Sequence, residues 1–299
     1  MRHVARLAFT IVTLALIAAA VPSRATAQKV KGRLVIVGGG ERTSEIMDRF
    51  IELAGGRENG RFVVFPMASE TPDTAGMRLT AEFKSRGAKN VAWLLFTKEQ
   101  ASAPGFADTL NGATGIWFGG GDQVRHTAAI LGTPVHAKLK ELYRQGTVMG
   151  GTSAGAAIMS RIMITGDELI NKDTRNAFVS IMKGNIQTVE GVGFLDNAII
   201  DQHFVKRKRL NRLISVVLEH PTVPGIGIDE ATAIIVNPDG TCDVLGEGTV
   251  VVFDARRATG IHADKAGNLA ARNISLSIYS AGEKFILKSN RPASQPSTR

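Results

Sequence analysis

The feature that most restricts the fold is a regular alternation of short apolar runs with longer amphipathic segments in the first half of the chain. Short apolar runs bounded by glycines are typical of buried strands, and the segments between them repeat their apolar positions at the helical period. The alternation builds βαβ units and predicts an α/β fold with a doubly wound, mostly parallel sheet. The predicted strands are 34–37, 62–65, 91–96, 115–118 and 147–149, and the predicted helices are about 44–54, 74–86, 122–131 and 134–145.

The second half of the chain has a different pattern. An apolar run at 198–200 leads into a basic segment that predicts a helix at about 206–219, and a strand is expected at 225–228. Short β-like runs separated by turn signals then predict C-terminal β-hairpins, at 232–236, 241–245, 249–253 and 274–287. We expect a single domain over 28–288 and a flexible Ser/Pro-rich tail over 289–299.

Residues 1–27 have the pattern of a signal peptide. Arg2 and Arg6 precede an uncharged apolar run over 7–21, and Ala25-Thr26-Ala27 supplies small residues for cleavage before Gln28. A retained anchor is the alternative, but the run is short of the ~20 residues that span a bilayer. We therefore expect an exported protein, periplasmic or extracellular, with no stable membrane anchor after cleavage.

Composition excludes several classes of protein. With 44% hydrophobic and 21% charged residues among 299, the chain is neither disordered nor fibrous. The net charge of +9 is compatible with nucleic acid, an anionic surface or a carboxylate-bearing substrate, and does not choose among them. A single cysteine, Cys242, excludes an internal disulfide framework and a Cys-rich zinc site. No grouping of metal-ligand spacing is present, so we expect no metal and no cofactor.

The sharpest local motif is the Gly-x-Ser-x-Gly at 151–155, directly after the fifth strand. Small residues around Ser153 allow a tight strand-to-helix turn that holds the hydroxyl above the sheet as a nucleophile. The amide of Ala154 then points toward the oxygen of a tetrahedral intermediate. A glycine-rich turn whose serine only caps a helix over 154–162 is the alternative.

A serine nucleophile needs a base, and His203 follows a buried strand at the same sheet edge as Ser153. For the other mature histidines, solvation or a local hydrogen bond is the better interpretation: His126, His136, His220 and His262. The base in turn needs a carboxylate to fix its tautomer. Three strand-end candidates remain open on spacing alone: Asp201, Asp229 and Glu230.

Two further segments carry candidate site residues. Gly119-Gly120-Gly121 follows the fourth strand, where the amide of Gly121 suits a second oxyanion donor and Gln123 a substrate contact. Neither this cluster nor Gly38-Gly39-Gly40 has a phosphate-loop pattern. The basic run 206–209 with Arg212 has no aromatic interleaving, which argues against nucleic acid, and a solvated helix face is the alternative. Because the run begins three residues after His203, we favour a site for a substrate carboxylate.

Four motifs together resemble the cyanophycinase branch of peptidase family S51, which also contains peptidase E. The motifs are Gly-Gly-Asp-Gln at 120–123, Gly-Gly-Thr-Ser-Ala-Gly-Ala at 150–156, Asp-Gln-His-Phe at 201–204 with Arg209 and Arg212, and Asp-Glu-Ala-Thr-Ala at 229–233. The resemblance spans about 33–255. It implies a flavodoxin-like, class I glutamine amidotransferase-like fold, commonly a homodimer, that hydrolyses cyanophycin, or another β-aspartyl peptide, without a cofactor.

Carried over position by position, the resemblance implies a triad of Ser153, His203 and Glu230, which chooses Glu230 over Asp201 by analogy. It implies an oxyanion hole of the Gly121 and Ala154 amides. Substrate-binding positions are Gln123, Asp201, Gln202, Arg209 and Arg212, with the arginines expected on a substrate carboxylate and Asp201 on its guanidinium. An Asp-X dipeptidase and an exported polyanion-binding protein are the alternatives. Residues 165–196 match nothing clearly and are expected to shape the pocket rim.

Overall fold

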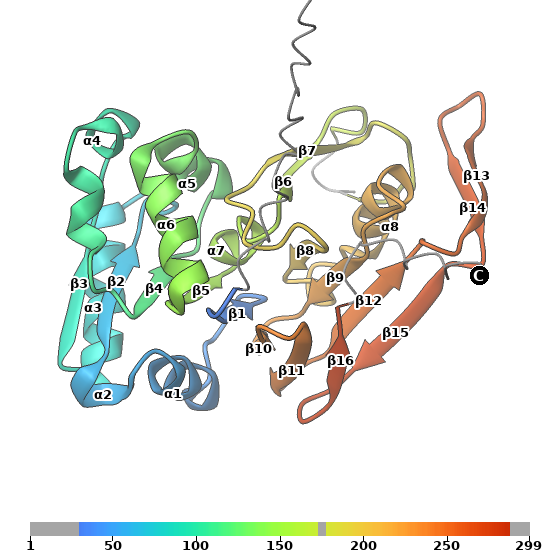
Figure 1. Cartoon of the computed structure of the whole chain (residues 1–299). Helices are drawn as coiled ribbons and strands as arrows, with labels where there is room; N and C mark the ends of the chain where they lie inside the picture. The colour runs from blue at the N-terminus through green and yellow to red at the C-terminus, as the bar shows by residue number, and fades with distance from the viewer. Residues whose placement is uncertain (1–29, 173–177, 288–299) are drawn as a thin grey trace, which may run out of the picture.

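The computed structural model describes residues 30–172 and 178–287. The predicted signal peptide and tail lie outside these residues, so both stay predictions. Five parallel strands form one half of the fold, as the sequence predicts (left in Figure 1). They are β1 (Leu34–Val37), β2 (Arg61–Phe65), β3 (Asn90–Trp93), β4 (Gly115–Phe118) and β5 (Val148–Thr152).

Helices cover both faces of this sheet. Alternate residues of the buried strands point to opposite sides, so Val35 packs with α1 (Ser44–Leu53) and α3 (Pro72–Ser85), and Ile36 packs with α5 (Gln123–Ile130) and α6 (Pro134–Gln145). On the side of the sheet that Val35 faces, aromatic rings pack edge to face. The ring centroids of Phe50 and Trp117, for example, lie 4.9 Å apart. Short helices complete this half, at α2 (Gly56–Asn59), α4 (Lys98–Ser102) and η1 (Phe106–Leu110).

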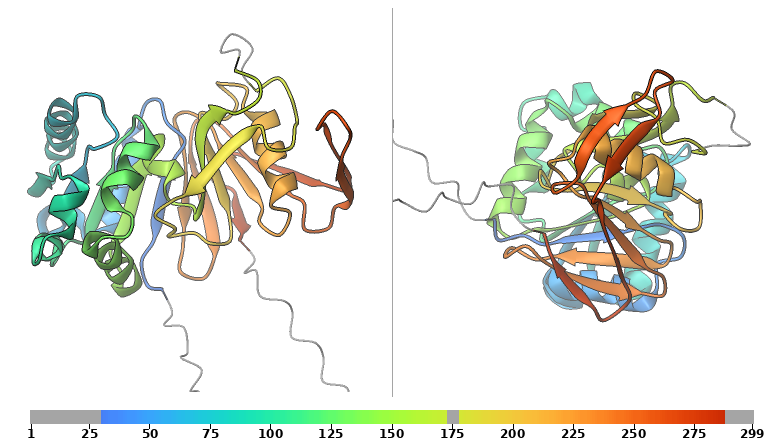
Figure 2. Two further views of the ribbon diagram at one scale, coloured as in Figure 1. Left: turned by 90° about the horizontal axis from the view of Figure 1, so that it is seen from above. Right: turned by 90° about the vertical axis from the view of Figure 1, so that its right-hand side faces the viewer.

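Three antiparallel strands extend the sheet beyond β1. They are β10 (Thr232–Val236), β11 (Thr241–Gly246) and β16 (Lys284–Ile286), which gives the order β16-β11-β10-β1-β5-β4-β2-β3. The remaining late strands form a second sheet of order β15-β12-β9-β8, made of β8 (Ile199–Gln202), β9 (Gly225–Ile228), β12 (Val250–Asp254) and β15 (Ser275–Tyr279). Figure 2 shows the two sheets side by side, and β10 contacts both β9 and β12 across the seam.

The outer parts are one helix and two hairpins. α8 (Leu210–Glu219) packs on the second sheet, and β13 (Thr259–Ala263) pairs with β14 (Leu269–Arg272). α7 (Ala154–Ala157) follows β5 and leads to the hairpin of β6 (Ile162–Glu168) and β7 (Ile186–Glu190). In the described ranges, no helix has the length and apolarity to cross a membrane.

Three local predictions are corrected. The helix expected at 206–219 begins at Leu210, because Lys208 has a φ of +54°, outside the helical range. The helix expected over 154–162 ends at Ala157. The run 274–287 is two strands, β15 and β16, which lie in different sheets.

Candidate active site

Ser153 occupies a strained turn between β5 and α7. Its φ of 54° and ψ of −110° lie outside the common regions, a conformation that costs about 1–3 kcal/mol and persists only where the surroundings enforce it. Gly155 permits the turn, since a Cβ there would lie 2.2 Å from the carbonyl oxygen of Phe118 on β4. The amide of Ser153 donates to the carbonyl of Val37 at 3.1 Å. The turn therefore holds the hydroxyl at the carboxyl end of the parallel strands.

His203 reaches Ser153 from the second sheet. It directly follows β8, and its amide donates to the carbonyl of Gly38 at 2.7 Å, which ties the two sheets together. The Nε2 atom of His203 lies 2.9 Å from Ser153 Oγ. The expectation that the two residues share one sheet edge is wrong, because β5 and β8 belong to different sheets, but the two side chains are in direct hydrogen-bond contact.

Glu230, and neither Asp201 nor Asp229, meets the other ring nitrogen. Its Oε1 lies 2.5 Å from His203 Nδ1, so Nδ1 donates to the carboxylate and Nε2 is left to accept from the serine. Asp229 Oδ1 instead accepts from the amide of Lys206 at 2.9 Å. Spacing left three carboxylates open, and the structure brings Glu230 to the imidazole.

The protonation states follow from burial and pairing. Burial lowers the pKa of His203, and the hydrogen bond to Glu230 opposes part of that shift. The hydrogen bond from His203 lowers the pKa of Glu230. At neutral pH the site therefore combines a neutral imidazole with an ionised carboxylate, the states that a general base and its supporting acid require.

Sequence reasoning missed the role of the glycines that end β1. A Cβ on Gly39, whose φ is +120°, would lie 2.3 Å from His203 Cε1, and the carbonyl of Gly39 accepts from the amide of Ala231 at 2.9 Å. The sequence signal that could have revealed this role is the run of three glycines at the end of β1, which has no phosphate-loop pattern. Such a run also suits a loop that other catalytic side chains must approach closely.

One of the two predicted oxyanion donors, Ala154, directly follows Ser153 in the chain. Gly120 packs beside Ser153, where a Cβ would be 3.5 Å from the serine Cβ, and Gly121 is its neighbour. Among the backbone hydrogen bonds of the described residues, none uses the amide of Gly121 or of Ala154. Both donors are thus left for another acceptor.

Asp201 and Arg212 lie elsewhere than predicted. They form a two-point ion pair with each other, Arg212 Nε to Asp201 Oδ2 at 2.8 Å and Nη2 to Oδ1, and each side chain is only 1% exposed. This corrects the expectation that the two contact a substrate, because neither offers an accessible surface. Arg209 Nη1 donates to the Oε1 of Gln202 at 2.7 Å, and both residues are at least nine-tenths buried. A substrate role for Arg209 and Gln202 stays a prediction.

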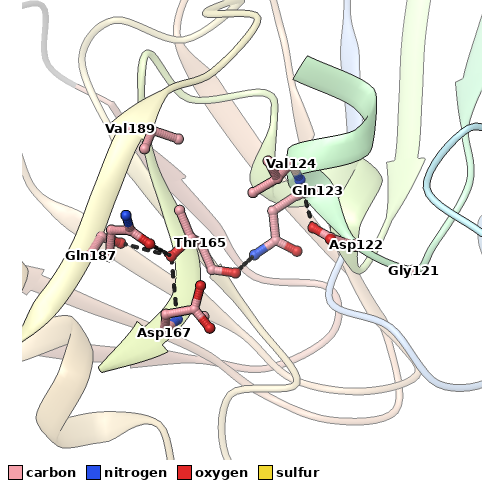
Figure 3. Close-up of a pocket in the computed structure, with 9 residues that line it drawn as sticks. Gly121, Asp122, Gln123, Val124, Thr165, Asp167, Gln187 and Val189 are labelled. Carbon is pink, nitrogen blue, oxygen red and sulfur yellow. Dashed lines mark hydrogen bonds between the residues drawn. The ribbon is translucent and has the colours of Figure 1, made fainter. Parts of the chain in front are cut away.

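Gln123 joins α5 to the β6–β7 hairpin. Its Nε2 donates to the carbonyl of Ile164 at 2.8 Å and to that of Thr165. Figure 3 shows it in the wall of a pocket of about 520 Å³, which also reaches Gly121. The opposite wall is formed by five residues of the hairpin, which are Thr165, Gly166, Asp167, Gln187 and Val189.

The other histidines make the expected local bonds. His126, His136 and His262 contact the carbonyls of Gly119, Val192 and Gly260 at 3.0, 3.0 and 2.8 Å. Over residues 30–172 and 178–287, no three His, Cys, Asp or Glu side chains are arranged to hold a metal ion.

Comparisons with known proteins point to one family. The profile of peptidase family S51 matches residues 34–243. The chain is 34% identical over 269 residues to a cyanophycinase of Synechococcus elongatus, covering 87% of this chain and 81% of that one. It is 31% identical over 273 residues to a cyanophycinase of Geminocystis herdmanii, covering 89% and 97%. The crystal structure of a peptidase from an acI-B1 Actinobacterium shares the fold, with a TM-score of 0.63 at 24% identity over 87% of this chain and 98% of that one.

Proposed function

The chain belongs to peptidase family S51, and from this premise we propose that it hydrolyses cyanophycin, a poly-aspartate that bears arginine on its β-carboxyls, to β-Asp-Arg dipeptides. One observation supports the chemistry above all. A continuous relay runs from Ser153 Oγ through His203 to Glu230, with heavy-atom distances of 2.9 and 2.5 Å. These are the distances at which a proton moves between a nucleophile and its base.

In the proposed first step, His203 Nε2 takes the proton of Ser153 as Oγ attacks a backbone carbonyl carbon of the substrate. Glu230 stabilises the imidazolium that forms, and it stays ionised because its own pKa is lowered by the same hydrogen bond. The C=O double bond opens, and its oxygen becomes an oxyanion bonded to the tetrahedral carbon.

The oxyanion is proposed to bind the amides of Gly121 and Ala154, since both are left without a backbone acceptor. Ala154 follows Ser153 in the chain, and Gly121 follows Gly120, which packs beside Ser153. One such donor contributes about 3–4 kcal/mol to transition-state stabilisation. His203 then protonates the leaving amine, the C–N bond breaks and an acyl-enzyme forms. Water, activated by the same imidazole, attacks the ester and releases Ser153.

Export and assembly complete the proposal. We propose that cleavage after Ala27 produces a mature enzyme that starts at Gln28 and acts in the periplasm or outside the cell. N-terminal sequencing of the protein recovered from periplasm and medium tests this, and an N-terminus at Met1 contradicts it. A homodimer is expected from the family resemblance, and light scattering of the purified protein measures it.

The test of activity is mass analysis of the products that the purified protein forms from cyanophycin, with Asp-X dipeptides as parallel substrates. We expect β-Asp-Arg from the polymer. Cleavage of Asp-X dipeptides alone overturns the proposed substrate. S153A should abolish turnover. S102A is the matched control, because the hydroxyl of Ser102 only donates to a carbonyl of its own helix, at 2.7 Å. Retained turnover in S153A overturns the mechanism.

A further inference from the structure

The pocket in Figure 3 lies between α5 and the β6–β7 hairpin. Its walls are the first turn of α5 and the β6–β7 hairpin, and its volume is about 520 Å³. It reaches Gly121, whose neighbour Gly120 packs beside Ser153. The pocket is therefore placed to receive a side chain of a substrate that Ser153 attacks.

The pocket carries negative charge. Among the residues that line it, Asp122 and Asp167 are charged, and no lysine, arginine or histidine is present. Asp122 is partly engaged, since its Oδ1 accepts from the amide of Val124 at 2.8 Å and its Oδ2 lies 3.9 Å from Arg125 Nε. Asp167 is exposed, and its carboxylate has no ion-pair partner within the described ranges. Asp167 is thus the carboxylate most available to a cation.

The pocket also contains a hydrogen-bond acceptor on a side chain that is otherwise buried. Gln123 is only 5% exposed, and its Nε2 must face the hairpin because both of its partners there are carbonyl oxygens. Its Oε1 accepts no hydrogen bond from any described residue. Gln123 Oε1 is not one of the buried atoms that lack a partner, so it is accessible from the pocket, where it suits a ligand that consists of donors.

An arginine side chain has the complementary chemistry. A guanidinium is a planar cation with five N–H donors and no acceptor, so it satisfies a carboxylate and an amide oxygen at once. Asp201 is unavailable for this task, since Arg212 already neutralises it. An anion fits poorly, because the pocket presents carboxylates and Asp122 already caps the first turn of α5.

We propose that this pocket binds the guanidinium of a substrate arginine arm, with Asp167 as its ion-pair partner and Gln123 Oε1 as a second acceptor. The inference rests on the proposed function and adds the residue that selects arginine. Asp167 lies on a hairpin outside the proposed triad. It acts on the recognition of the substrate and takes no part in the chemical steps.

The test compares two synthetic β-aspartyl peptides that carry either arginine or citrulline on each β-carboxyl. Citrulline keeps the length and shape of arginine and removes its charge. We measure kcat/KM for both peptides with the wild-type protein, with D167N and with E190Q. Glu190 is the matched control, since it is an exposed carboxylate on the same hairpin and lies outside this pocket.

We expect D167N to lower kcat/KM for the arginine peptide about tenfold and to leave the citrulline peptide unchanged, so that the preference for arginine falls. E190Q should keep the wild-type preference. An unchanged ratio in D167N, or an equal loss on both peptides, overturns the inference while leaving the proposed function intact. Failure of the wild-type protein to release dipeptides from cyanophycin overturns the proposed function instead.

Discussion

A methyl group added at Gly39 should disable the proposed site while leaving the fold intact. In G39A the new Cβ would lie 2.3 Å from His203 Cε1 and 2.4 Å from Nε2. Ordinary contact requires about 3.4 Å, so the ring must move by roughly 1 Å. A misplacement of about 1 Å costs about 10²-fold in rate, or about 2.7 kcal/mol of transition-state stabilisation.

The same substitution also strains the backbone, because alanine at a φ of +120° costs about 1–3 kcal/mol. G105A separates the two effects. Gly105 has a φ of +77°, and a Cβ there meets no heavy atom within 4 Å. Both variants should lose a few degrees of melting temperature, since about 1 kcal/mol corresponds to about 2–4 °C in a protein of this size.

The assay is kcat for dipeptide release, measured beside thermal unfolding. We expect G105A to keep the wild-type kcat and G39A to fall at least about 10²-fold at comparable stability. Wild-type kcat in G39A would refute the reasoning, because the ring would then have room that the structure does not show. An equal loss in both variants would assign the effect to general strain and would equally refute it.

Three further predictions follow from buried groups. Burial lowers the pKa of His203, so kcat/KM should fall at acid pH with a midpoint below the ordinary histidine value of 6.5, and a midpoint above 6.5 contradicts this. R212M leaves Asp201 buried without its partner, so the free energy of unfolding measured with denaturant should fall by about 3–5 kcal/mol. The double variant D201L/R212M should recover most of that free energy. His126 is buried with a pKa of about 4, so its imidazole takes up a proton in the unfolded chain before it does so in the folded protein as the pH falls. The free energy of unfolding of the wild-type protein should therefore fall by about 3 kcal/mol between pH 6.5 and 4. H126F should lack that loss, and equal pH slopes in urea unfolding would contradict the assignment.

The first half of the fold was predictable because its signals are local. Buried strands such as 34–37 and 115–118 read as apolar runs, and the helices between them show the helical period. Ser153 was predictable because a strained turn requires small neighbours, which are visible in the sequence. The one-edge rule of parallel sheets does not explain why Ser153 and His203 meet, because β5 and β8 belong to different sheets.

The rest depends on contacts between segments that are far apart in the chain. Apolar runs at 225–228 and 232–236 look alike, yet β9 and β10 belong to different sheets. The pairing of Asp201 with Arg212 joins β8 to α8, and the charge pattern alone does not separate a salt bridge from two substrate contacts. The loop at Gly39 escaped notice because its contribution is the absence of a side chain, and such an absence indicates a role only once its neighbour is known.

The residues of the proposed triad come from two sheets, and this has a consequence for when the site forms during synthesis and folding. Ser153 leaves the ribosome 50 residues ahead of His203, and Glu230 follows a further 27 residues later. A nascent chain that already displays the hydroxyl has nothing to deprotonate it. On the proposed mechanism the newborn polypeptide is inert toward its host until the later strands have docked, and this delay needs neither an inhibitor nor a propeptide.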